Sequence, residues 1–444
     1  MGTVGGGKVL VVHPGGPLRG RVAPPGDKSI SHRAILLAAM ARGESRVENL
    51  LVAGVTRPML AALRALGVPW TLEGTTLEVA SPGFRAWRAA DRPLDCGHSA
   101  TTMRLLAGAL AAAGVPAVLD GSPGLRRRPM RRVVEPLQRM GVPIEDTDGR
   151  PPLRLAARSP DRPLRGGVFT LAVASAQVKS AILLAGLAAA DPVEVREPGP
   201  SRDHTERMLR SLGVRVDQGP GWVRLTPPAG PLPPLRLRVP GDISSAAFVI
   251  VAGLIVPGSE VLLDGVELNP TRTGLLEALQ AMGARVRVEP LGEQGGEPVG
   301  NIHVTHTPDL RGIRVEGALV VRMIDEFPIF AVAAACARGV TEVRDAEELR
   351  YKESDRIAQL VAQLRRLGVD AEERPDGFVI RGGRPVQGGE VDAQGDHRLA
   401  MALAVAGLAA QGPVRVRNGA MYLESYPAFV EDLRDLGARM EEAE

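Results

Sequence analysis

The stretch Pro24-Pro25-Gly26-Asp27-Lys28-Ser29-Ile30-Ser31-His32-Arg33, which runs into AILLAAM at residues 34–40, contains the pattern on which the chain is built. Pro-Pro-Gly ends any preceding element, and Asp27, Ser29 or Ser31 can cap a helix start. The residues that follow are apolar almost all round, which predicts a helix buried on every face. Lys28, Ser29 and Arg33 then lie near its start, where free N–H groups and the helix dipole favour an anion. Taken alone, the stretch fits a phosphate or carboxylate site and a capped helix with a solvated basic turn equally well.

Polar helix starts of this kind recur before small, apolar helices. The apolar segments read AILLAAMA, MRLLAGALAAAG, SAILLAGLAAA, AAFVIVAGLIV, FAVAAACA and LAMALAVAGLAA, and their polar starts are residues 27–29, 97–102, 175–177, 241–245, 325–328 and 395–398. Small apolar side chains are typical of helices that pack tightly in an interior.

A second motif keeps the same interval. An amphipathic helix ends in Leu/Met-Gly-Val/Ala before a short strand, with glycines at 67, 141, 213, 283, 368 and 437, which lie 74, 72, 70, 85 and 69 residues apart. Glycine just beyond a helix end accepts a positive φ. Six copies predict a repeat of about 70 residues with one buried and one surface helix, and three repeats in each of two domains.

The Pro-rich segment PPAGPLPPLRLRVPGD at residues 227–242 falls at the midpoint and predicts a crossover between domains. We therefore expect an α/β fold with one domain at 23–240 and a discontinuous second domain made of 1–22 and 241–444. Helix starts that converge on two facing surfaces would place the active site in the cleft between the domains.

Composition excludes several classes of protein. The chain has 444 residues, 44% of them hydrophobic and 24% charged, which indicates a globular protein larger than one ordinary domain. No apolar run reaches the roughly 18–20 residues of a membrane span, and the N-terminus lacks a signal-peptide pattern, so we expect a soluble, cytoplasmic protein without a membrane partner. The net charge of +3 is dispersed and no nucleic-acid-binding module is recognisable, which favours anionic small molecules over nucleic acid.

Lysine is rare in this arginine-rich chain. Only Lys8, Lys28, Lys179 and Lys352 are lysines among 54 basic residues. Because arginine is not deprotonated in proteins, a retained lysine is a candidate where a compact ammonium or a transferable proton is needed. Chance retention is the alternative.

Several further clusters carry ionisable groups. Arg126-Arg127-Arg128 and Asp396-His397-Arg398 could bind an anion, although the first could equally be a solvated charge run and His397 a core histidine. Asp325 could be a helix cap or an acid–base group. In residues 350–356, helical spacing would place Lys352 and Arg356 on one face and Glu353 about 100° away around the helix, although a solvated amphipathic turn is the usual explanation. The chain has no Walker A motif, no GxGxxG, no GxSxG and no convincing metal-ligand spacing, and its two cysteines have no CxxC spacing.

A resemblance to a known family is carried by these segments taken together and in this order: PPGDKSISHR, GHSATTMR, RRRPM, ASAQVKSAILLAGL, SRDHTE, RMIDEFP, RYKESDR and GDHRLAM. Through them the chain resembles the 5-enolpyruvylshikimate-3-phosphate (EPSP) synthase family. The segment SAQVKSAILLAGL, together with Ala100, resembles the class II branch of the family. The resemblance covers nearly the whole chain. It implies two inside-out α/β domains, each of three βαβαββ repeats. It also implies a monomer that transfers the enolpyruvyl group of phosphoenolpyruvate to shikimate 3-phosphate, without metal or organic cofactor.

The resemblance also implies roles for individual residues. Asp325 would accept the proton of the attacking hydroxyl and Glu353 would move a proton on the substrate carbon, with Lys352 and Lys28 assisting. Residues implied for shikimate 3-phosphate are Lys28, Ser29, Arg33, Ser175, Gln177, Arg202, Asp325 and Lys352; those implied for phosphoenolpyruvate are Lys28, Ala100, Arg128, Gln177, Arg356 and Arg398.

Three positions depart from the family pattern. His98 replaces the usual Asn, and Glu424 stands where class I members carry a Lys, so no binding role is assigned to it. Ala100 replaces the class I Gly, and we expect its methyl group to crowd the inhibitor glyphosate. Two alternatives remain: a UDP-N-acetylglucosamine enolpyruvyl transferase, whose loop cysteine has no counterpart here, and a non-enzymatic anion-binding scaffold.

Overall fold

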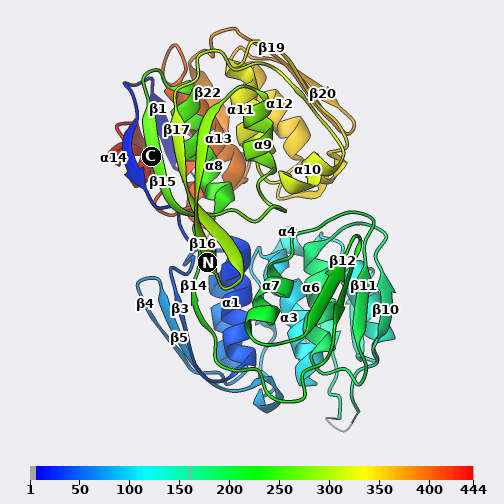
Figure 1. Cartoon of the computed structure of the whole chain (residues 1–444). Helices are drawn as coiled ribbons and strands as arrows, with labels where there is room; N and C mark the ends of the chain where they lie inside the picture. Colours follow the sequence, from blue (N-terminus) through cyan, green and yellow to red (C-terminus); the bar gives the residue numbers. More distant parts are fainter. Residues whose placement is uncertain (1–6, 160–161, 444) are drawn as a thin grey trace. The chain divides into compact units, whose positions relative to one another are not determined.

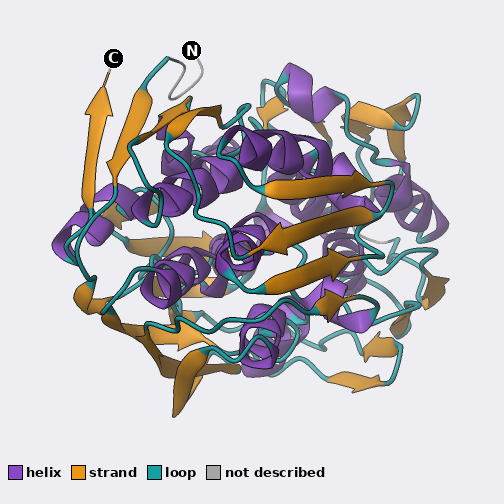
Figure 2. Ribbon diagram, turned by 90° about the horizontal axis from the view of Figure 1, so that it is seen from above, coloured by secondary structure: helices purple, strands orange, loops and turns teal. Residues whose placement is uncertain are grey.

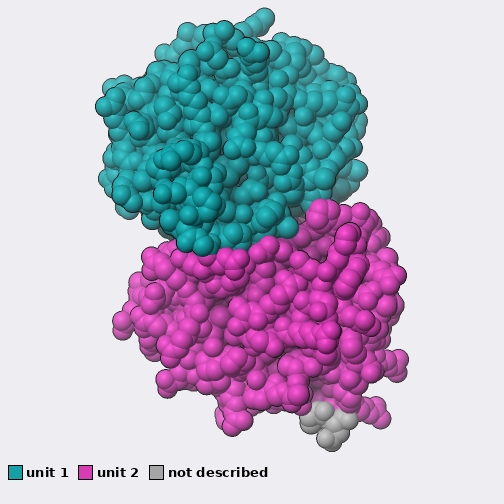
Figure 3. Space-filling view, in the orientation of Figure 1, with its two compact units in different colours: residues 1–25, 240–292, 298–444 teal, residues 26–239, 293–297 magenta. Residues whose placement is uncertain are grey.

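The computed structural model describes residues 7–159 and 162–443 (Figure 1). The chain divides into two compact units, shown in Figure 3. Unit 1 consists of Met1–Pro25, Pro240–Gly292 and Pro298–Glu444, and unit 2 of Gly26–Val239 and Glu293–Glu297.

Both units are built from the same repeat: strand, interior helix, strand, surface helix and two further strands. The described strands form six four-stranded sheets, one for each repeat. In every sheet the first strand pairs in parallel with the second. The second strand pairs antiparallel with the fourth, and the third lies at the edge beside the fourth. The prediction of three βαβαββ repeats per domain is therefore confirmed. Figure 2 shows the helices in purple and the strands in orange.

In unit 2 the interior helices are α1 (Lys28–Met40), α3 (Ala100–Ala113) and α6 (Ala176–Gly186), and the surface helices are α2 (Arg57–Ala65), α5 (Arg131–Arg139) and α7 (His204–Ser211). Repeat by repeat, the strands are β14 (Arg236–Arg238), β3 (Arg42–Glu48), β4 (Trp70–Glu73) and β5 (Thr76–Pro82); β6 (Leu94–Asp95), β7 (Ala117–Asp120), β8 (Ile144–Thr147) and β9 (Arg150–Leu155); β10 (Gly167–Thr170), β11 (Val193–Arg196), β12 (Val216–Gly219) and β13 (Trp222–Leu225). The short helices η1 (Phe84–Ala86) and α4 (Pro123–Arg126) lie in connections.

In unit 1 the interior helices are α8 (Ile243–Ile255), α11 (Phe327–Cys336) and α13 (His397–Leu408), and the surface helices are α9 (Gly274–Ala281), α12 (Arg356–Arg366) and α14 (Phe429–Asp435). The strands are β2 (Arg19–Val22), β15 (Glu260–Glu267), β16 (Arg285–Gln294) and β17 (Glu297–Thr305); β18 (Arg314–Val315), β19 (Gly339–Val343), β20 (Asp370–Arg374) and β21 (Gly377–Gly382); β22 (Gly389–Asp392), β23 (Val414–Arg417), β24 (Arg439–Ala443) and β1 (Val9–His13). The short helices α10 (Ala318–Arg322), η2 (Glu347–Tyr351) and η3 (Gly419–Glu424) lie in connections.

Each unit is closed by a strand from a distant part of the chain. In unit 2, β14 provides the first strand of the repeat that contains α1, pairing Arg236 with Arg46 of β3. In unit 1, β2 completes the repeat of α8, and β1 lies between β23 and β24 in the repeat of α13. Each unit therefore has three complete repeats, although not all of them are continuous in the sequence.

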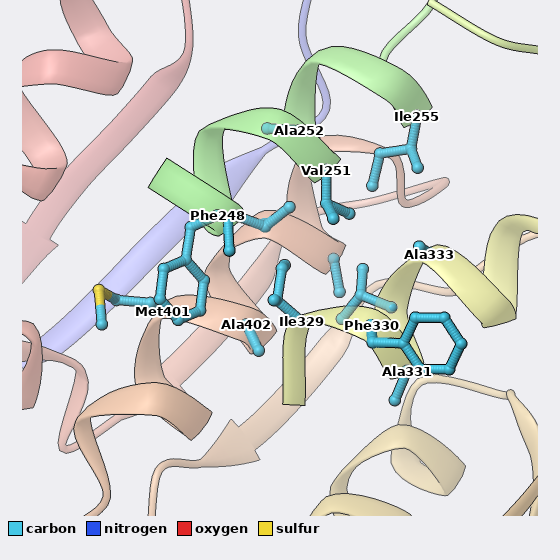
Figure 4. Close-up of a cluster of buried hydrophobic side chains, with 14 of the residues drawn as sticks. Phe248, Val251, Ala252, Ile255, Ile329, Phe330, Ala331, Ala333, Met401 and Ala402 are labelled. Atoms are coloured by element: carbon cyan, nitrogen blue, oxygen red, sulfur yellow. The ribbon is translucent and has the colours of Figure 1, made fainter. Parts of the chain in front are cut away.

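The interior helices pack against one another in each unit. In unit 1, side chains of α8, α11 and α13 point toward each other, among them Phe248, Ile329 and Met401 (Figure 4), and all three are almost fully buried. Burial of one such side chain stabilises the fold by about 2–3 kcal/mol. In unit 2, α3 and α6 approach closely: a Cβ on Gly108 would lie 2.3 Å from the carbonyl oxygen of Ala181. The small side chains of these helices are therefore required by the packing distance.

The predicted helix boundaries are largely confirmed. The six repeat glycines all have positive φ, with values of +81° (Gly67), +92° (Gly141), +79° (Gly213), +88° (Gly283), +75° (Gly368) and +109° (Gly437). Side chains cap five of the six interior helices: Asp27, Ser99, Ser175, Asp242 and Asp396. The sixth, α11, begins after Glu326, whose side chain makes no capping bond. Among the described residues, no helix is long and apolar enough to cross a membrane.

Candidate active site

The first group of site residues surrounds the start of α1 in unit 2. Asp27 caps the helix by accepting a hydrogen bond from the N–H of Ile30 at 2.7 Å. Lys28 and Ser29 follow in the first turn and are half-buried. The backbone comes so close to Asn49 that a Cβ on Gly26 would meet the Asn49 carbonyl oxygen at 1.8 Å. The glycine is therefore needed to bring this turn into place.

Arg33 is 3% exposed and is held by neutral acceptors. Its guanidinium donates to the Thr205 hydroxyl at 2.7 Å, the Ser180 hydroxyl at 2.8 Å and the Ser29 carbonyl at 2.9 Å. Burial, together with the charge of Arg202, lowers the pKa of Arg33 to about 10, against the opposing effect of carboxylates that include Glu206. Arg33 therefore remains charged at neutral pH, with a second cation nearby. Two neighbouring cations are a suitable environment for a dianionic phosphate.

His32 was not identified from the sequence as a site residue, yet it joins two predicted binding segments. Its Nδ1 lies 2.7 Å from the carbonyl oxygen of Lys28, and its Nε2 lies 2.9 Å from that of Val55 and 3.2 Å from the hydroxyl of Ser99. Burial lowers the pKa of His32 to about 4, so the ring is neutral at physiological pH. Ser99 caps α3 directly before Ala100, so His32 couples the starts of α1 and α3. In the sequence, the feature that could have indicated this role is that His32 follows Lys28 by four residues, or about one helical turn.

Gln177, at the start of α6, contacts the start of α3. Its Nε2 donates to the Thr101 hydroxyl at 2.8 Å, and its Oε1 accepts a hydrogen bond from Arg104. Arg104 also donates to the carbonyl oxygen of Pro129 at 3.1 Å, beside Arg128. Arg104 is thus a second residue that the sequence reasoning missed, and it links α3, α6 and the loop before α5.

The remaining predicted residues of unit 2 occupy helix starts or connections. Ser175 caps α6 by accepting from the N–H of Val178 at 3.5 Å, and Arg202 lies in the connection before α7. In the arginine triplet only Arg128 is half-buried, while Arg126 and Arg127 are exposed. The solvated-run interpretation therefore fits two of the three arginines.

In unit 1, Arg356 is surrounded by carboxylates and is 1% exposed. Its Nε lies 2.8 Å from Asp396, its Nη2 2.7 Å from Glu353 and its Nη1 3.4 Å from Asp325. Burial opposes the charge, but the Asp396 and Glu353 carboxylates raise the pKa of Arg356 above its ordinary value. In turn, Arg356 outweighs the effect of burial on Asp396 and lowers the pKa of that carboxyl group. Arg398 Nη2 lies 3.6 Å from Asp325, so Asp325 faces two guanidinium groups.

The predicted helical spacing between Lys352 and Arg356 is wrong. Residues 347–351 form the short helix η2, Lys352 is extended, and α12 begins only at Arg356. The reason is Asp355, which accepts from the N–H of Ala358 at 3.0 Å and so caps α12, while its carboxylate also pairs with Arg350 at 2.8 Å. A capping residue has non-helical backbone angles, so the helix cannot extend back to Lys352.

Although Lys352 is not part of α12, its ammonium group is influenced by the carboxylates of Glu348 and Asp325. Its Nζ lies 3.9 Å from Glu348, and its side chain is 20% exposed. Burial lowers the pKa of the Lys352 ammonium, with Asp325 and Glu348 acting in the opposite direction. A lysine whose pKa is below the ordinary value, set among carboxylates, is suited to proton transfer.

Two units of three βαβαββ repeats, with cations and carboxylates gathered at the helix starts, define the enolpyruvyl transferase class. The enolpyruvyl transferase NikO from Streptomyces tendae has the same fold, with a TM-score of 0.79 at 22% identity over 99% of each chain. EPSP synthase from Acinetobacter baumannii is more similar, with a TM-score of 0.89 and 39% identity over 98% of this chain and 100% of that chain.

The sequence comparisons identify the family. The model of EPSP synthase (3-phosphoshikimate 1-carboxyvinyltransferase) matches residues 12–433. A 3-phosphoshikimate 1-carboxyvinyltransferase from Acidithiobacillus ferrooxidans is 48% identical over 442 residues, or 98% of this chain and 99% of that protein. One from Roseiflexus is 48% identical over 415 residues, or 93% of this chain and 95% of that protein. The chain belongs to the EPSP synthase family, whose members are transferases of the shikimate pathway of aromatic amino acid biosynthesis.

Proposed function

We propose that the chain transfers the enolpyruvyl group of phosphoenolpyruvate to the 5-hydroxyl of shikimate 3-phosphate. The 5-oxygen forms a bond to C2 of phosphoenolpyruvate while C3 takes up a proton, which gives a tetrahedral intermediate. Loss of a C3 proton and departure of phosphate then restore the double bond. This chemistry needs cations for two phosphates and a carboxylate, and groups that accept and return protons.

Residues of unit 2 bind shikimate 3-phosphate in this proposal. The set consists of Lys28, Ser29, Arg33, Ser175, Gln177 and Arg202. The proposal is supported by the helix starts at α1 and α6, whose free N–H groups favour anions, and by the nearby charges of Arg33 and Arg202. Arg33 donates three of its five N–H groups to Ser29, Ser180 and Thr205, which fixes the orientation of its guanidinium, so we assign it a charge contact alongside Lys28 and Arg202.

Phosphoenolpyruvate would contact Lys28, Ala100, Arg128, Gln177, Arg356 and Arg398. Asp325 would accept the proton of the 5-hydroxyl, Glu353 would deliver and recover the proton at C3, and Lys352 would bind substrate and assist. The observation that carries the proposal is the set of two carboxylates, Asp325 and Glu353, on one buried guanidinium beside Lys352. Such a group combines anion binding with proton transfer.

The finer expectations stay predictions. They are a monomeric, cytoplasmic enzyme that needs neither metal nor organic cofactor, and a methyl group on Ala100 that weakens glyphosate binding. Substitution of Ala100 by glycine should therefore sharpen inhibition at fixed phosphoenolpyruvate.

The test measures phosphate release from shikimate 3-phosphate and phosphoenolpyruvate in the presence of a chelator. Wild-type protein should require both substrates, and Glu353→Ala should lower kcat by about 10²–10⁴-fold, the usual contribution of a general acid–base group. Glu347→Gln, which alters an exposed carboxylate on the neighbouring η2 helix, is the matched control and should retain activity.

The proposal fails if phosphate is released with UDP-N-acetylglucosamine and not with shikimate 3-phosphate, which would assign a different acceptor. Silence with both acceptors would favour an anion-binding scaffold. Full activity of Glu353→Ala would remove the assigned proton-transfer role while leaving the reaction intact.

A further inference from the structure

The connection that carries Arg202 has little backbone support of its own. It runs from Glu197, after β11, to Asp203, before α7, and contains Pro198, Gly199 and Pro200. The two prolines have no N–H to donate, and the glycine adds conformational freedom. Such a segment needs side chains to hold it in one conformation.

Glu197 supplies most of that support. Its Oε1 accepts from the backbone N–H of Ser201 at 3.2 Å, and the Ser201 hydroxyl lies 2.7 Å from Oε2 and 3.0 Å from Oε1. These bonds close the loop at the residue directly before Arg202. The Glu197 side chain is 7% exposed, so its charge needs a buried partner.

That partner is Lys179, two residues after Gln177 on α6. Its Nζ lies 2.8 Å from Glu197 Oε1, 2.8 Å from Glu206 Oε1 and 3.4 Å from the carbonyl oxygen of Ser201. The Lys179 side chain is 4% exposed and that of Glu206 2%. An ammonium has three N–H donors in a compact arrangement, and the three oxygens use all of them. This geometry explains why a lysine stands here in a chain that otherwise prefers arginine.

The charges of this cluster are balanced. Lys179 and Arg33 provide two positive charges, and Glu197 and Glu206 provide two negative ones. Burial alone would lower the pKa of Lys179, but Glu206 and Glu197 raise it above its ordinary value, which keeps the ammonium charged. Glu206 also acts on Arg33, whose guanidinium is hydrogen-bonded to Ser180 of α6 and Thr205 of α7. The cluster therefore ties α1, α6 and the loop before α7 together.

We infer that Lys179 is a positioning residue for shikimate 3-phosphate: through Glu197 and Ser201 it fixes the loop of residues 197–202 and aims Arg202 at the phosphate. This inference rests on the proposed function, in which Arg202 binds that substrate. Lys179 itself does not contact the substrate. Its removal is therefore expected to weaken binding of one substrate, and not to slow the chemical step.

Ser201→Ala tests the link without disturbing a charge. It removes the hydroxyl contacts to Glu197 and leaves the Lys179 pairs in place. KM for shikimate 3-phosphate should rise about 5- to 20-fold, as expected for the loss of hydrogen bonds to a charged group. KM for phosphoenolpyruvate and kcat should change by less than about twofold. Ser45→Ala, which removes another buried hydroxyl of unit 2 that accepts from Leu235 N–H, is the matched control and should leave both KM values unchanged.

A double variant tests Lys179 itself. Lys179→Met alone would leave two buried carboxylates without their cation and is expected to unfold the unit. Lys179→Met combined with Glu206→Gln keeps the remaining charges of Arg33 and Glu197 balanced. It should raise KM for shikimate 3-phosphate at least as much as Ser201→Ala does. Lys179→Arg should give an intermediate value, because a planar guanidinium matches the three oxygens only in part.

Hydrogen–deuterium exchange of the loop amides provides a readout that does not depend on activity. Exchange at residues 197–203 should accelerate in Ser201→Ala and in the double variant, and not in Ser45→Ala. Unchanged exchange there would overturn the positioning role even if the wild-type protein were inactive. An equal rise in both KM values, or a fall in kcat alone, would overturn it in an active enzyme, whereas inactivity of the wild type with faster exchange in the variants would contradict only the proposed function.

Discussion

The two units share one repeat topology, yet a buried arginine near the helix starts is held differently in each, as Arg356 of unit 1 and Arg33 of unit 2 show. Arg356 in unit 1 lies 2.7–2.8 Å from the carboxylates of Glu353 and Asp396, whereas Arg33 in unit 2 lies at the same distances from the hydroxyls of Thr205 and Ser180. A carboxylate partner adds an acid–base group to the site and neutralises the guanidinium. A hydroxyl partner does not cancel the positive charge of the guanidinium, so that charge can still attract an anion. We therefore expect proton transfer to depend on unit 1 and binding of shikimate 3-phosphate mainly on unit 2.

The largest expected effect separates these two roles in kinetics. Asp325→Asn should lower kcat by about 10²–10⁴-fold because the amide cannot accept the hydroxyl proton. Arg202→Met should instead act mainly on KM for shikimate 3-phosphate. Steady-state rates with each substrate varied in turn measure both effects. Asp309→Asn, at an exposed carboxylate paired with Arg338, is the control. A large kcat loss in Arg202→Met with no change in KM would contradict the division of labour.

A second comparison concerns stability. Arg356→Met removes the cation paired with the fully buried carboxylate of Asp396 and should lower the free energy of unfolding by about 3–5 kcal/mol. Arg33→Met leaves hydroxyl and carbonyl groups without their donor, while Glu206 keeps its direct partner Lys179, so the loss should be only about 1–3 kcal/mol. Urea unfolding of both variants, followed by far-ultraviolet circular dichroism, measures the difference.

The order of the two losses is decisive. Equal losses, or a larger loss for Arg33→Met, would mean that the electrostatic contrast between the units does not control their stability.

The smallest expected effect is a dependence of stability on pH that originates in unit 2. The pKa of His32 falls from 6.5 to about 4 on burial, so between these values the unfolded chain binds more protons than the folded chain. Its contribution is present above pH 6.5 and is lost as the pH falls toward 4, with about 2 kcal/mol lost between pH 7 and pH 5. Asp396 in unit 1, with a pKa below 3.8, loses its contribution only at lower pH.

Urea unfolding at pH 7 and pH 5 measures this effect. His32→Asn should flatten the dependence, and His13→Asn, at a partly exposed histidine, should leave it unchanged. An unaltered dependence in His32→Asn would assign the titration to another group.

Local sequence patterns were sufficient for the repeat architecture. Each repeat glycine has a positive φ and lies just beyond the end of a helix, and each small apolar segment forms a buried helix. These features depend on neighbours within a few residues and on burial, which periodicity reports directly. The polar helix starts could be identified in the same way, because a cap is recognisable from its own residue type.

The partners of the site residues could not be predicted in this way. Arg104 meets Gln177 across 73 positions, and Arg356 meets Asp396 across 40. Such pairs form only when separate repeats come together, and a single sequence contains no local trace of them. The incorrect helical spacing at Lys352 has a local cause: Asp355 caps α12, so the helix begins only at Arg356, and within a cluster of charged residues a capping aspartate does not stand out from its neighbours.

Because each unit includes a strand from a distant part of the chain, the two units cannot complete their folding at the same stage of synthesis. When the ribosome releases the chain from its N-terminus, β1 emerges first, yet both of its neighbours, β23 and β24, lie at the far end of the sequence. Nearly all of unit 2, by contrast, is one uninterrupted segment that ends with β14, its own closing strand. The unit that is proposed to bind shikimate 3-phosphate can therefore fold while the protein is still being made, and the unit that carries the proposed proton-transfer groups must wait until β23 and β24 have been made.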